Sequence, residues 1–302
     1  MKLPFPNCEL KVGSKYLTTE LRHSNDILGS ASATRSRMED DGYLLVRGLH
    51  VKVQVLVARP KILEKLTERG MLDPNASPMG GIFNPDYKEG TTTGSMNNKE
   101  LTRSPEFRQV VEGERVMNFF SHFLGGEPLS FDFKWLRTVG TGAGSPIQCD
   151  IVFMGRGTQN LYSCWTPIGD VTLDMGPLVI CLGSHKFEKV RQTYGASDVD
   201  RDLIEGKFSD DPVEIVDKFG GIWATTEFEA GDAIIFSMFN MHGSLVNTSN
   251  KVRISVDTRY QLAAEPVDER WGGENPIGHY EWKKPDAVIE PPERSRARWV
   301  FK

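Results

Sequence analysis

The sequence predicts a mainly β fold with flanking helices, arranged as a sandwich or a jelly roll. Seven short apolar or aromatic runs follow one another between about residue 130 and residue 262, separated by Gly, Asp and Asn turns. Helical spacing is concentrated in the first third of the chain. The 302 residues, 39% of them hydrophobic, are enough to bury a large core. We therefore expect a single domain over residues 1–302.

Composition excludes several classes of protein. The net charge of −5 gives no broad basic surface, so no nucleic-acid partner is expected. No pair of cysteines has the CxxC spacing of a structural zinc site; the cysteines are Cys8, Cys149, Cys164 and Cys181. The first residues lack the apolar core of a signal peptide, and no apolar run is long enough to span a membrane. We expect a cytoplasmic protein with no membrane partner.

The N-terminal part, residues 1–129, mixes strand and helix. The run "DGYLLVRGL" at 41–49 predicts a buried strand. A helix is expected after Pro60, ending at Gly70, and another in "EFRQVVEGERVMNFFSHFLGG". Between them, residues 75–105 form a long polar stretch rich in Gly, Thr, Asn and Pro. Such a loop is either a lid over a site or a plain mobile loop, and the sequence leaves both open.

The remaining elements are strands, followed by a Pro- and charge-rich C-terminal segment. We expect the core to cover about 130–262 and residues 263–302 to wrap around the outside. The predicted strands are "LSFDFKWLRTV", "QCDIVFM", "NLYSCWTPIG", "GPLVICLG", "GIWATTEF", "DAIIFSMF" and "VRISVDTRYQ".

Two residues of the closing strands attract attention. His242 ends an apolar run, and Arg253 follows it by eleven residues. A tight turn near Asn247 would make the two strands a hairpin with His242 and Arg253 opposite each other.

The last of these strands alternates polar and apolar residues. Arg253, Ser255, Asp257 and Arg259 lie on one face of a strand with period two. That face either meets solvent or lines a binding cavity. Two arginines in a cavity would suit an anionic ligand, because a guanidinium binds a carboxylate through two hydrogen bonds.

A second polar pair lies in "QCDIVFM". Period two places Gln148 and Asp150 on the same strand face. A carboxylate within an apolar strand is costly unless it is paired, exposed or bound to a metal. Asp150 is therefore either an edge-strand residue that faces water or part of a site.

Together these pieces resemble the phytanoyl-CoA dioxygenase family of Fe(II)/2-oxoglutarate oxygenases. The likeness runs from about residue 40 to about residue 261 and is strong from Arg137 onward. It is carried by "DIVFMGRGTQNLYSCWTPIGDVTLDMGPLVICLGSHK" and by "GDAIIFSMFNMHGSLVNTSNKVRISVDTRYQ". The resemblance implies a double-stranded β-helix, the cupin-like form of the jelly roll.

The resemblance also assigns roles. Two histidines and one carboxylate on one face of Fe(II) leave positions open for 2-oxoglutarate and O2. Asp150 and His242 match the family's catalytic metal ligands by type and order. Arg253 and Ser244 would hold the distal carboxylate of 2-oxoglutarate, and Arg137 the other carboxylate end.

Two further residues of this block keep more than one interpretation. Trp165 would form a wall of the 2-oxoglutarate pocket, or it is simply a core tryptophan. His185, in "GSH", lies outside the three ligand positions and is expected to be structural.

The sequence departs from the family at Gln148, where the family has the first histidine of its His-x-Asp motif. An amide oxygen is a poorer ligand for Fe(II) than imidazole. Gln148 could ligate the metal weakly, or metal could bind through Asp150, His242 and water with low activity. The third outcome is a protein that has lost catalysis and keeps the 2-oxoglutarate pocket.

The function predicted is an Fe(II)- and 2-oxoglutarate-dependent oxygenase that uses O2 to hydroxylate a small molecule. The alternative is a catalytically impaired jelly-roll protein that binds 2-oxoglutarate or another small anion. A cupin-type isomerase is a third, weaker candidate. The substrate itself is not predicted; its pocket is expected among residues 75–105, Arg156 and the mouth of the barrel. The sequence makes no prediction of oligomeric state.

Overall fold

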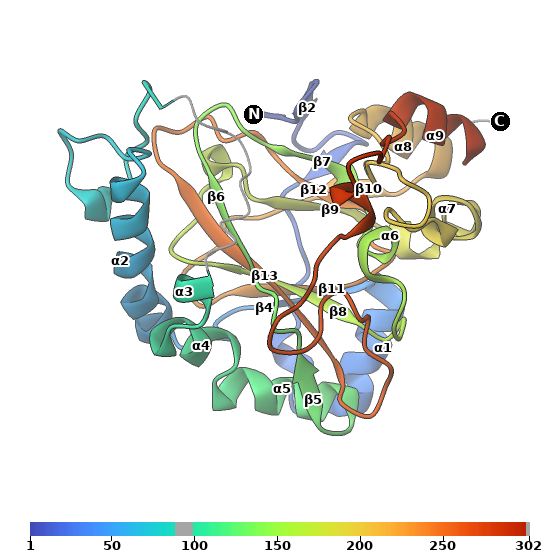
Figure 1. Cartoon of the computed structure of the whole chain (residues 1–302), viewed down its shortest axis with the longest axis horizontal. Coiled ribbons are helices and arrows are strands. Elements are labelled where there is room, and N and C mark those ends of the chain that lie inside the picture. The colour runs from blue at the N-terminus through green and yellow to red at the C-terminus, as the bar shows by residue number, and fades with distance from the viewer. Residues whose placement is uncertain (88–98, 300–302) are drawn as a thin grey trace.

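Two β-sheets and a set of helices around them form the molecule (Figure 1). The computed structural model describes residues 1–87 and 99–299. In this part of the chain the smaller sheet has the order β3, β10, β9, β12, β7. Its strands are β3 (Leu17–Thr18), β10 (Ile222–Ala224), β9 (Leu178–Leu182), β12 (His242–Ser244) and β7 (Ser145–Gln148).

The larger sheet has the order β4, β11, β8, β13, β5, with β6 also paired to β13. Its strands are β4 (Tyr43–Val46), β11 (Ala233–Ser237), β8 (Tyr162–Pro167), β13 (Arg253–Leu262), β5 (Pro128–Ser130) and β6 (Trp135–Val139). A separate hairpin joins β1 (Lys2–Pro4) to β2 (Glu9–Lys11). This two-sheet arrangement is the predicted double-stranded β-helix, or jelly roll, with flanking helices.

Helices from the N-terminal part cover the outer face of the larger sheet (Figure 1). Apolar residues of α2 and α4 pack on β6 and β13, and those of α1 and α5 pack on β4 and β11. These helices are α1 (Ala31–Asp41), α2 (Lys52–Glu68), α4 (Pro105–Val111) and α5 (Glu114–Leu124). The inner face of the same sheet contributes Trp165, Ile234 and Phe236 to a core shared with the smaller sheet.

The remaining helices are short. They are α3 (Lys99–Thr102), α6 (Ile151–Met154), α7 (Glu188–Gln192), α8 (Pro212–Phe219) and α9 (Pro292–Arg298), with 3₁₀ turns at Asn25–Ile27, Pro78–Gly80, Leu173–Met175, Ser184–Lys186, Tyr194–Ala196 and Glu281–Lys283. The segment 75–105 thus holds a 3₁₀ turn and α3, while its residues 88–98 lie outside the described part. None of the helices in 1–87 and 99–299 is long and apolar enough to cross a membrane.

The alternating pattern of β13 determines which side chains enter the barrel. Ile254 and Val256 pack with the helices on the outer face. Arg253 and Arg259 belong to the other set, and each is only 2% exposed. Successive side chains of a strand point to opposite faces, so the polar set points between the two sheets. The alternative of a solvent-facing polar face on this strand is therefore wrong.

The predicted hairpin of His242 and Arg253 is also wrong. β12 pairs with β7 and β9 in the smaller sheet, whereas β13 pairs with β5, β6 and β8 in the larger sheet. The chain crosses from one sheet to the other between these strands. His242 and Arg253 consequently approach the barrel interior from opposite sheets.

Three local predictions require correction. The run "QCDIVFM" is not one strand, because β7 ends at Gln148 and Ile151–Met154 form the helical turn α6. The run "LSFDFKWLRTV" is divided into β5 and β6. The helix that was predicted to begin after Pro60 begins earlier, because α2 starts at Lys52 and Pro60 lies inside it. Its buried side chains, including Val55 and Ile62, lie on both sides of Pro60, so packing outweighs the hydrogen bond that the proline cannot donate.

Candidate functional site

Asp150 lies where β7 ends and connects the two sheets. Its backbone has helical dihedrals and stands at the start of α6, so it is not part of the strand as the sequence pattern predicted. The side chain is 2% exposed. Oδ1 lies 3.7 Å from Nε2 of His242, and Oδ2 lies 3.0 Å from Nη2 of Arg259. Oδ2 also accepts a hydrogen bond from the hydroxyl of Ser163.

The charges around Asp150 keep its carboxyl ionised. Burial alone would raise the pKa of Asp150. Arg259, His242 and the hydrogen bond from Ser163 outweigh burial, and the pKa is lowered from its ordinary value. Asp150 is therefore a buried anion rather than a neutral acid.

The ring of His242 is oriented by its own backbone neighbourhood. Nδ1 lies 3.0 Å from the carbonyl oxygen of Asn240, which can only accept, so Nδ1 carries the proton and donates it there. The other ring nitrogen, Nε2, then faces Oδ1 of Asp150 at 3.7 Å. A carboxylate oxygen and an imidazole nitrogen that face each other in this way can both ligate a cation.

The spacing of these two atoms fits a shared metal ion. Ligand atoms about 2.1 Å from a divalent ion can be at most about 4.2 Å apart. The 3.7 Å between Oδ1 of Asp150 and Nε2 of His242 lies within that limit. A carboxylate oxygen and an imidazole nitrogen are also a donor pair that iron accepts.

Gln148 is the neighbour of this pair. It is the register partner of His242 across β7 and β12, and residues directly opposite each other in a sheet share a face. Gln148 is half-buried. In 1–87 and 99–299 no three His, Cys, Asp or Glu residues come together as a metal-binding group. A metal held by Asp150 and His242 would thus depend on an amide or on water for further ligands.

Arg253 carries a buried charge that its surroundings do not balance. Nη1 donates to the hydroxyl of Ser255 at 2.7 Å, while Nε has no hydrogen-bond partner among the described residues. Burial lowers the pKa of Arg253 to about 10, so it stays charged at neutral pH. The nearby Asp257 is already bonded to Arg137. A buried, partly unpaired guanidinium is the feature expected of a site for an anionic ligand.

Other residues predicted for the site are brought to the same interior in different ways. Arg137 is engaged with Asp257. Trp165 is a core residue, stacked edge-to-face on Phe228, and its ring also lies 5.8 Å from Cζ of Arg253. Its burial agrees with a core tryptophan, and its role as a wall of the 2-oxoglutarate pocket stays a prediction. The hydroxyl of Ser244 accepts a hydrogen bond from the backbone of Ser145 and fastens β12 to β7.

Two residues expected outside the metal position lie apart from it. His185 lies within hydrogen-bonding distance of the carbonyl of Glu39, 3.0 Å from Nε2, which agrees with a structural role. Arg156 binds Asp198 and the hydroxyl of Tyr280 next to the C-terminal segment, and its place beside the substrate pocket stays a prediction.

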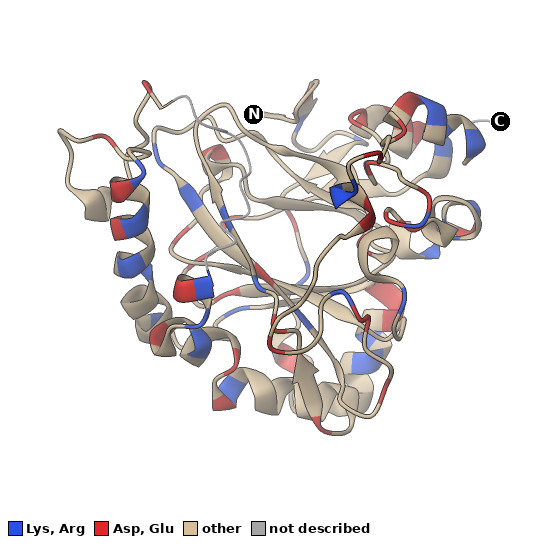
Figure 2. Cartoon of the chain, in the orientation of Figure 1, with Lys and Arg blue, Asp and Glu red and all other residues tan. Residues whose placement is uncertain are grey.

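The sequence did not reveal the partners of Asp150. Ser163 and Arg259 are register partners on β8 and β13, and both reach Asp150 from the opposite sheet. Alternation on β13 placed Arg259 correctly on the polar face. Which carboxylate it meets depends on how the sheets face each other, and no local pattern encodes that. Figure 2 shows charged residues on strands in the middle of the molecule as well as on the outer helices.

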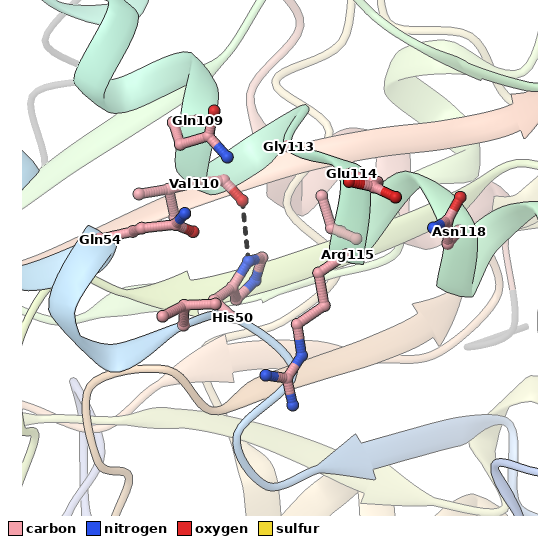
Figure 3. A pocket seen from close by; sticks show the side chains of 10 residues that line it. His50, Gln54, Gln109, Val110, Gly113, Glu114, Arg115 and Asn118 are labelled. Carbon is pink, nitrogen blue, oxygen red and sulfur yellow. Dashed lines mark hydrogen bonds between the residues drawn. The ribbon is translucent and has the colours of Figure 1, made fainter.

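The cavity drawn in Figure 3 is a different place. It has a volume of about 460 Å³ and is lined by residues of α2, α4 and α5, among them Gln54, Gln109 and Arg115. His50 at its base lies 2.9 Å from both the carbonyl of Val110 and the hydroxyl of Thr166. Burial lowers the pKa of His50 to about 4, so this ring is neutral and already satisfied. His50 is therefore not a candidate catalytic residue of this cavity.

Solved structures with the same architecture include two enzymes described as non-heme and alpha ketoglutarate dependent, SnoN and SnoK. The epimerase SnoN, in complex with Fe3+, alpha ketoglutarate and nogalamycin RO, has a TM-score of 0.55 at 15% identity, over 86% of this chain and 92% of that one. EctD from S. alaskensis in its apoform has a TM-score of 0.55 at 18% identity, over 96% and 98%. The carbocyclase SnoK from nogalamycin biosynthesis has a TM-score of 0.54 at 15% identity, over 79% and 88%. At these identities the likeness establishes the fold.

The sequence itself establishes the family. Residues 38–255 match the phytanoyl-CoA dioxygenase (PhyH) family, which is more than half of the chain. The chain belongs to the phytanoyl-CoA dioxygenase family. No curated protein sequence matches it.

Proposed function

We propose that the protein is an Fe(II)- and 2-oxoglutarate-dependent oxygenase that hydroxylates a small molecule. The observation that carries the proposal is the approach of Oδ1 of Asp150 to Nε2 of His242, 3.7 Å apart in a buried interior. Family membership over residues 38–255 supports the same conclusion. When bound, iron, 2-oxoglutarate and O2 supply the oxidising power for a C–H bond.

The residues of this chain would bind and orient those groups. Asp150 offers a charged oxygen and His242 offers a nitrogen whose tautomer is fixed by Asn240. Gln148 stands beside them and can offer a neutral oxygen. These side chains are shielded from bulk solvent, because Asp150, His242 and Arg253 are each at most 8% exposed. Low solvent access strengthens every electrostatic contact of the site.

Arg253 would hold the distal carboxylate of 2-oxoglutarate. Its unpaired Nε and its buried charge favour a carboxylate ligand. Trp165 would border that ligand, and Ser244 could add a hydrogen bond from its hydroxyl. Arg137 is a weaker candidate for the other carboxylate end, because Asp257 already occupies it.

One alternative function has specific support. A protein that binds 2-oxoglutarate or another small anion without catalysis would keep Arg253 and lose tight metal binding. Gln148 as a neutral third donor, and Arg259 already paired with Asp150, both favour that outcome. The retained Asp150 and His242 favour the oxygenase.

Succinate release separates the two functions. Purified protein with Fe(II), 2-oxoglutarate, ascorbate and O2 should release succinate slowly in the absence of the primary substrate. Gln148→His should raise both metal affinity and succinate release, because imidazole is the better ligand. Asp150→Asn is the matched control that should abolish the release.

The opposite pattern would remove the oxygenase proposal. If the wild type binds 2-oxoglutarate but releases no succinate, the protein is a binding protein and not an oxygenase. A Gln148→His variant with no gain in metal affinity or turnover would show that position 148 is not a ligand position.

A further inference from the structure

The guanidinium of Arg259 lies against the carboxylate that the proposed metal would need. Nη2 of Arg259 is 3.0 Å from Oδ2 of Asp150, and both side chains are at most 3% exposed. A salt bridge between groups this buried is not weakened by solvent as a surface pair is. Asp150 therefore has a cationic partner before any metal is present.

Three more contacts hold Arg259 in place. Nε donates to Sδ of Met154 at 3.2 Å, and Nη1 lies 3.4 Å from the carbonyl of Thr258. The ring of Trp135 lies 4.6 Å from Cζ, within the range of a cation–π contact. The guanidinium is thus fixed on four sides and is not a mobile surface charge.

The arrangement divides the two oxygens of Asp150. Oδ2 is occupied by Arg259 and by the hydroxyl of Ser163. Oδ1 alone is directed toward His242. Asp150 can then offer one oxygen, not two, to a cation on the side of His242.

The local charge is also set by Arg259. Asp150 contributes one negative charge and Arg259 one positive charge, while the amide of Gln148 contributes none. A divalent cation next to Asp150 would be attracted by the carboxylate and repelled by the fixed positive charge of Arg259 behind it. Repulsion in a buried setting is large compared with the same repulsion in water.

We propose that Arg259 is a built-in counter-ion of Asp150 that orients the carboxylate and keeps the affinity for divalent metal low until an anion joins the site. This inference rests on the proposed function, since it concerns the same metal position. 2-Oxoglutarate, held by Arg253, would add the missing negative charge. Metal and 2-oxoglutarate therefore bind cooperatively, each strengthening the other.

Titration calorimetry with Mn(II) alone tests the inference without any turnover. Arg259→Gln should bind Mn(II) about tenfold more tightly than the wild type in the absence of 2-oxoglutarate, because one repelling charge is gone. Arg259→Lys keeps the charge and is the matched control, with an affinity close to that of the wild type. The enhancement of Mn(II) affinity by 2-oxoglutarate should be smaller in Arg259→Gln.

The results also distinguish this inference from the proposed function. Equal or weaker Mn(II) binding by Arg259→Gln, or none at all, overturns the inference. Binding of Mn(II) alone by Arg259→Gln but not by the wild type supports the inference. The oxygenase function is removed when the wild type also fails to bind Mn(II) at saturating 2-oxoglutarate. Binding by both with equal affinity leaves the oxygenase standing and removes the role of Arg259.

A second measurement covers the case in which Arg259→Gln does not fold. In metal-free protein, Asp150→Asn should lower Tm by several degrees, because Arg259 is left as an unpaired buried charge. His242→Gln is the control and should change Tm less. A rise of Tm in Asp150→Asn would contradict the pairing and overturn the inference.

Discussion

Two buried charge clusters of this protein are built differently. Under the C-terminal segment, Arg270 has no exposed side-chain surface and contacts three carboxylates, Asp198, Asp200 and Asp268, at 3.5, 2.7 and 2.6 Å. Between the two sheets, Arg253 has a hydroxyl partner and an unpaired Nε. The first cluster surrounds its cation with acceptors, and the second leaves a cation short of them.

The difference indicates what each cluster is for. Asp198 and Asp200 are 72 and 70 residues from Arg270 in the sequence, so their ion pairs fasten the C-terminal segment to the loop that holds them. Asp268 lies on the same segment as Arg270 and completes the set of carboxylates. His279 adds a contact to Asp200 at 2.8 Å. Arg253 and its neighbours have three guanidiniums, with Arg137 and Arg259, for the two carboxylates Asp150 and Asp257. Excess positive charge in a buried interior favours an anionic ligand.

The largest expected effect is on stability, at Arg270. Arg270→Met should lower the free energy of unfolding by about 3–5 kcal/mol, because three carboxylates lose a buried partner. Urea denaturation followed by circular dichroism measures it. Arg201→Met is the control, since Arg201 is 61% exposed and its pair with Asp202 is worth little. Equal effects at both positions would mean that the cluster does not fasten the C-terminal segment.

The complementary change is at Arg253. Arg253→Ala should weaken 2-oxoglutarate binding by about 2–5 kcal/mol, because a charge-assisted contact is lost. Its effect on unfolding should be smaller than that of Arg270→Met, since no carboxylate in 1–87 and 99–299 forms an ion pair with Arg253. Calorimetric titration and a denaturation curve on the same preparation give both values. Unchanged 2-oxoglutarate affinity would move the anion site elsewhere, with Arg259 as the first residue to test.

Sequence patterns predicted the fold better than the contacts of the site. Alternation along β13 identified Arg253 and Arg259 as one face, because period two is a local property of the backbone. The hairpin prediction for His242 and Arg253 was wrong because the chain changes sheets between them, and no local pattern records such a crossing. The run after Asp150 was assigned to a strand because short apolar runs do not distinguish strand from helix.

Partners across the barrel were the least predictable feature. Asp150 was correctly singled out as a carboxylate that needs a partner, on the energetic ground that an unpaired buried charge is costly. The identity of that partner, Arg259, follows only from the way the two sheets face each other. The same holds for Arg156: the sequence placed it near the substrate pocket but did not reveal its ion pair with Asp198.

A smaller effect should appear in the acid limb of the stability curve. Burial alone would raise the pKa of Asp198, but Arg156, the backbone N–H of Arg201 and Arg270 hold it at about 2. The folded state thus binds this proton less readily than the unfolded chain, whose Asp has a pKa of about 3.9. The stabilisation is complete above about pH 4 and is lost as pH falls toward about 2. Because its partner Arg156 is partly exposed to solvent, we expect this stabilisation to be about 1–2 kcal/mol at neutral pH.

Asp198→Asn checks this assignment through unfolding measured from pH 5 to pH 2. The variant should be less stable than the wild type at pH 5, and the difference should shrink as the pH approaches 2. A constant difference across the range would show that the carboxyl of Asp198 is not the group that titrates.

The central claim is that Asp150 and His242 share a metal next to a 2-oxoglutarate bound by Arg253. A crystal structure with Mn(II) and 2-oxoglutarate tests it most directly, with diffraction data that record the anomalous signal of manganese. The account predicts one anomalous peak in contact with Oδ1 of Asp150 and Nε2 of His242, and a carboxylate of 2-oxoglutarate on the guanidinium of Arg253. No peak at saturating Mn(II), or 2-oxoglutarate bound away from Arg253, would contradict it.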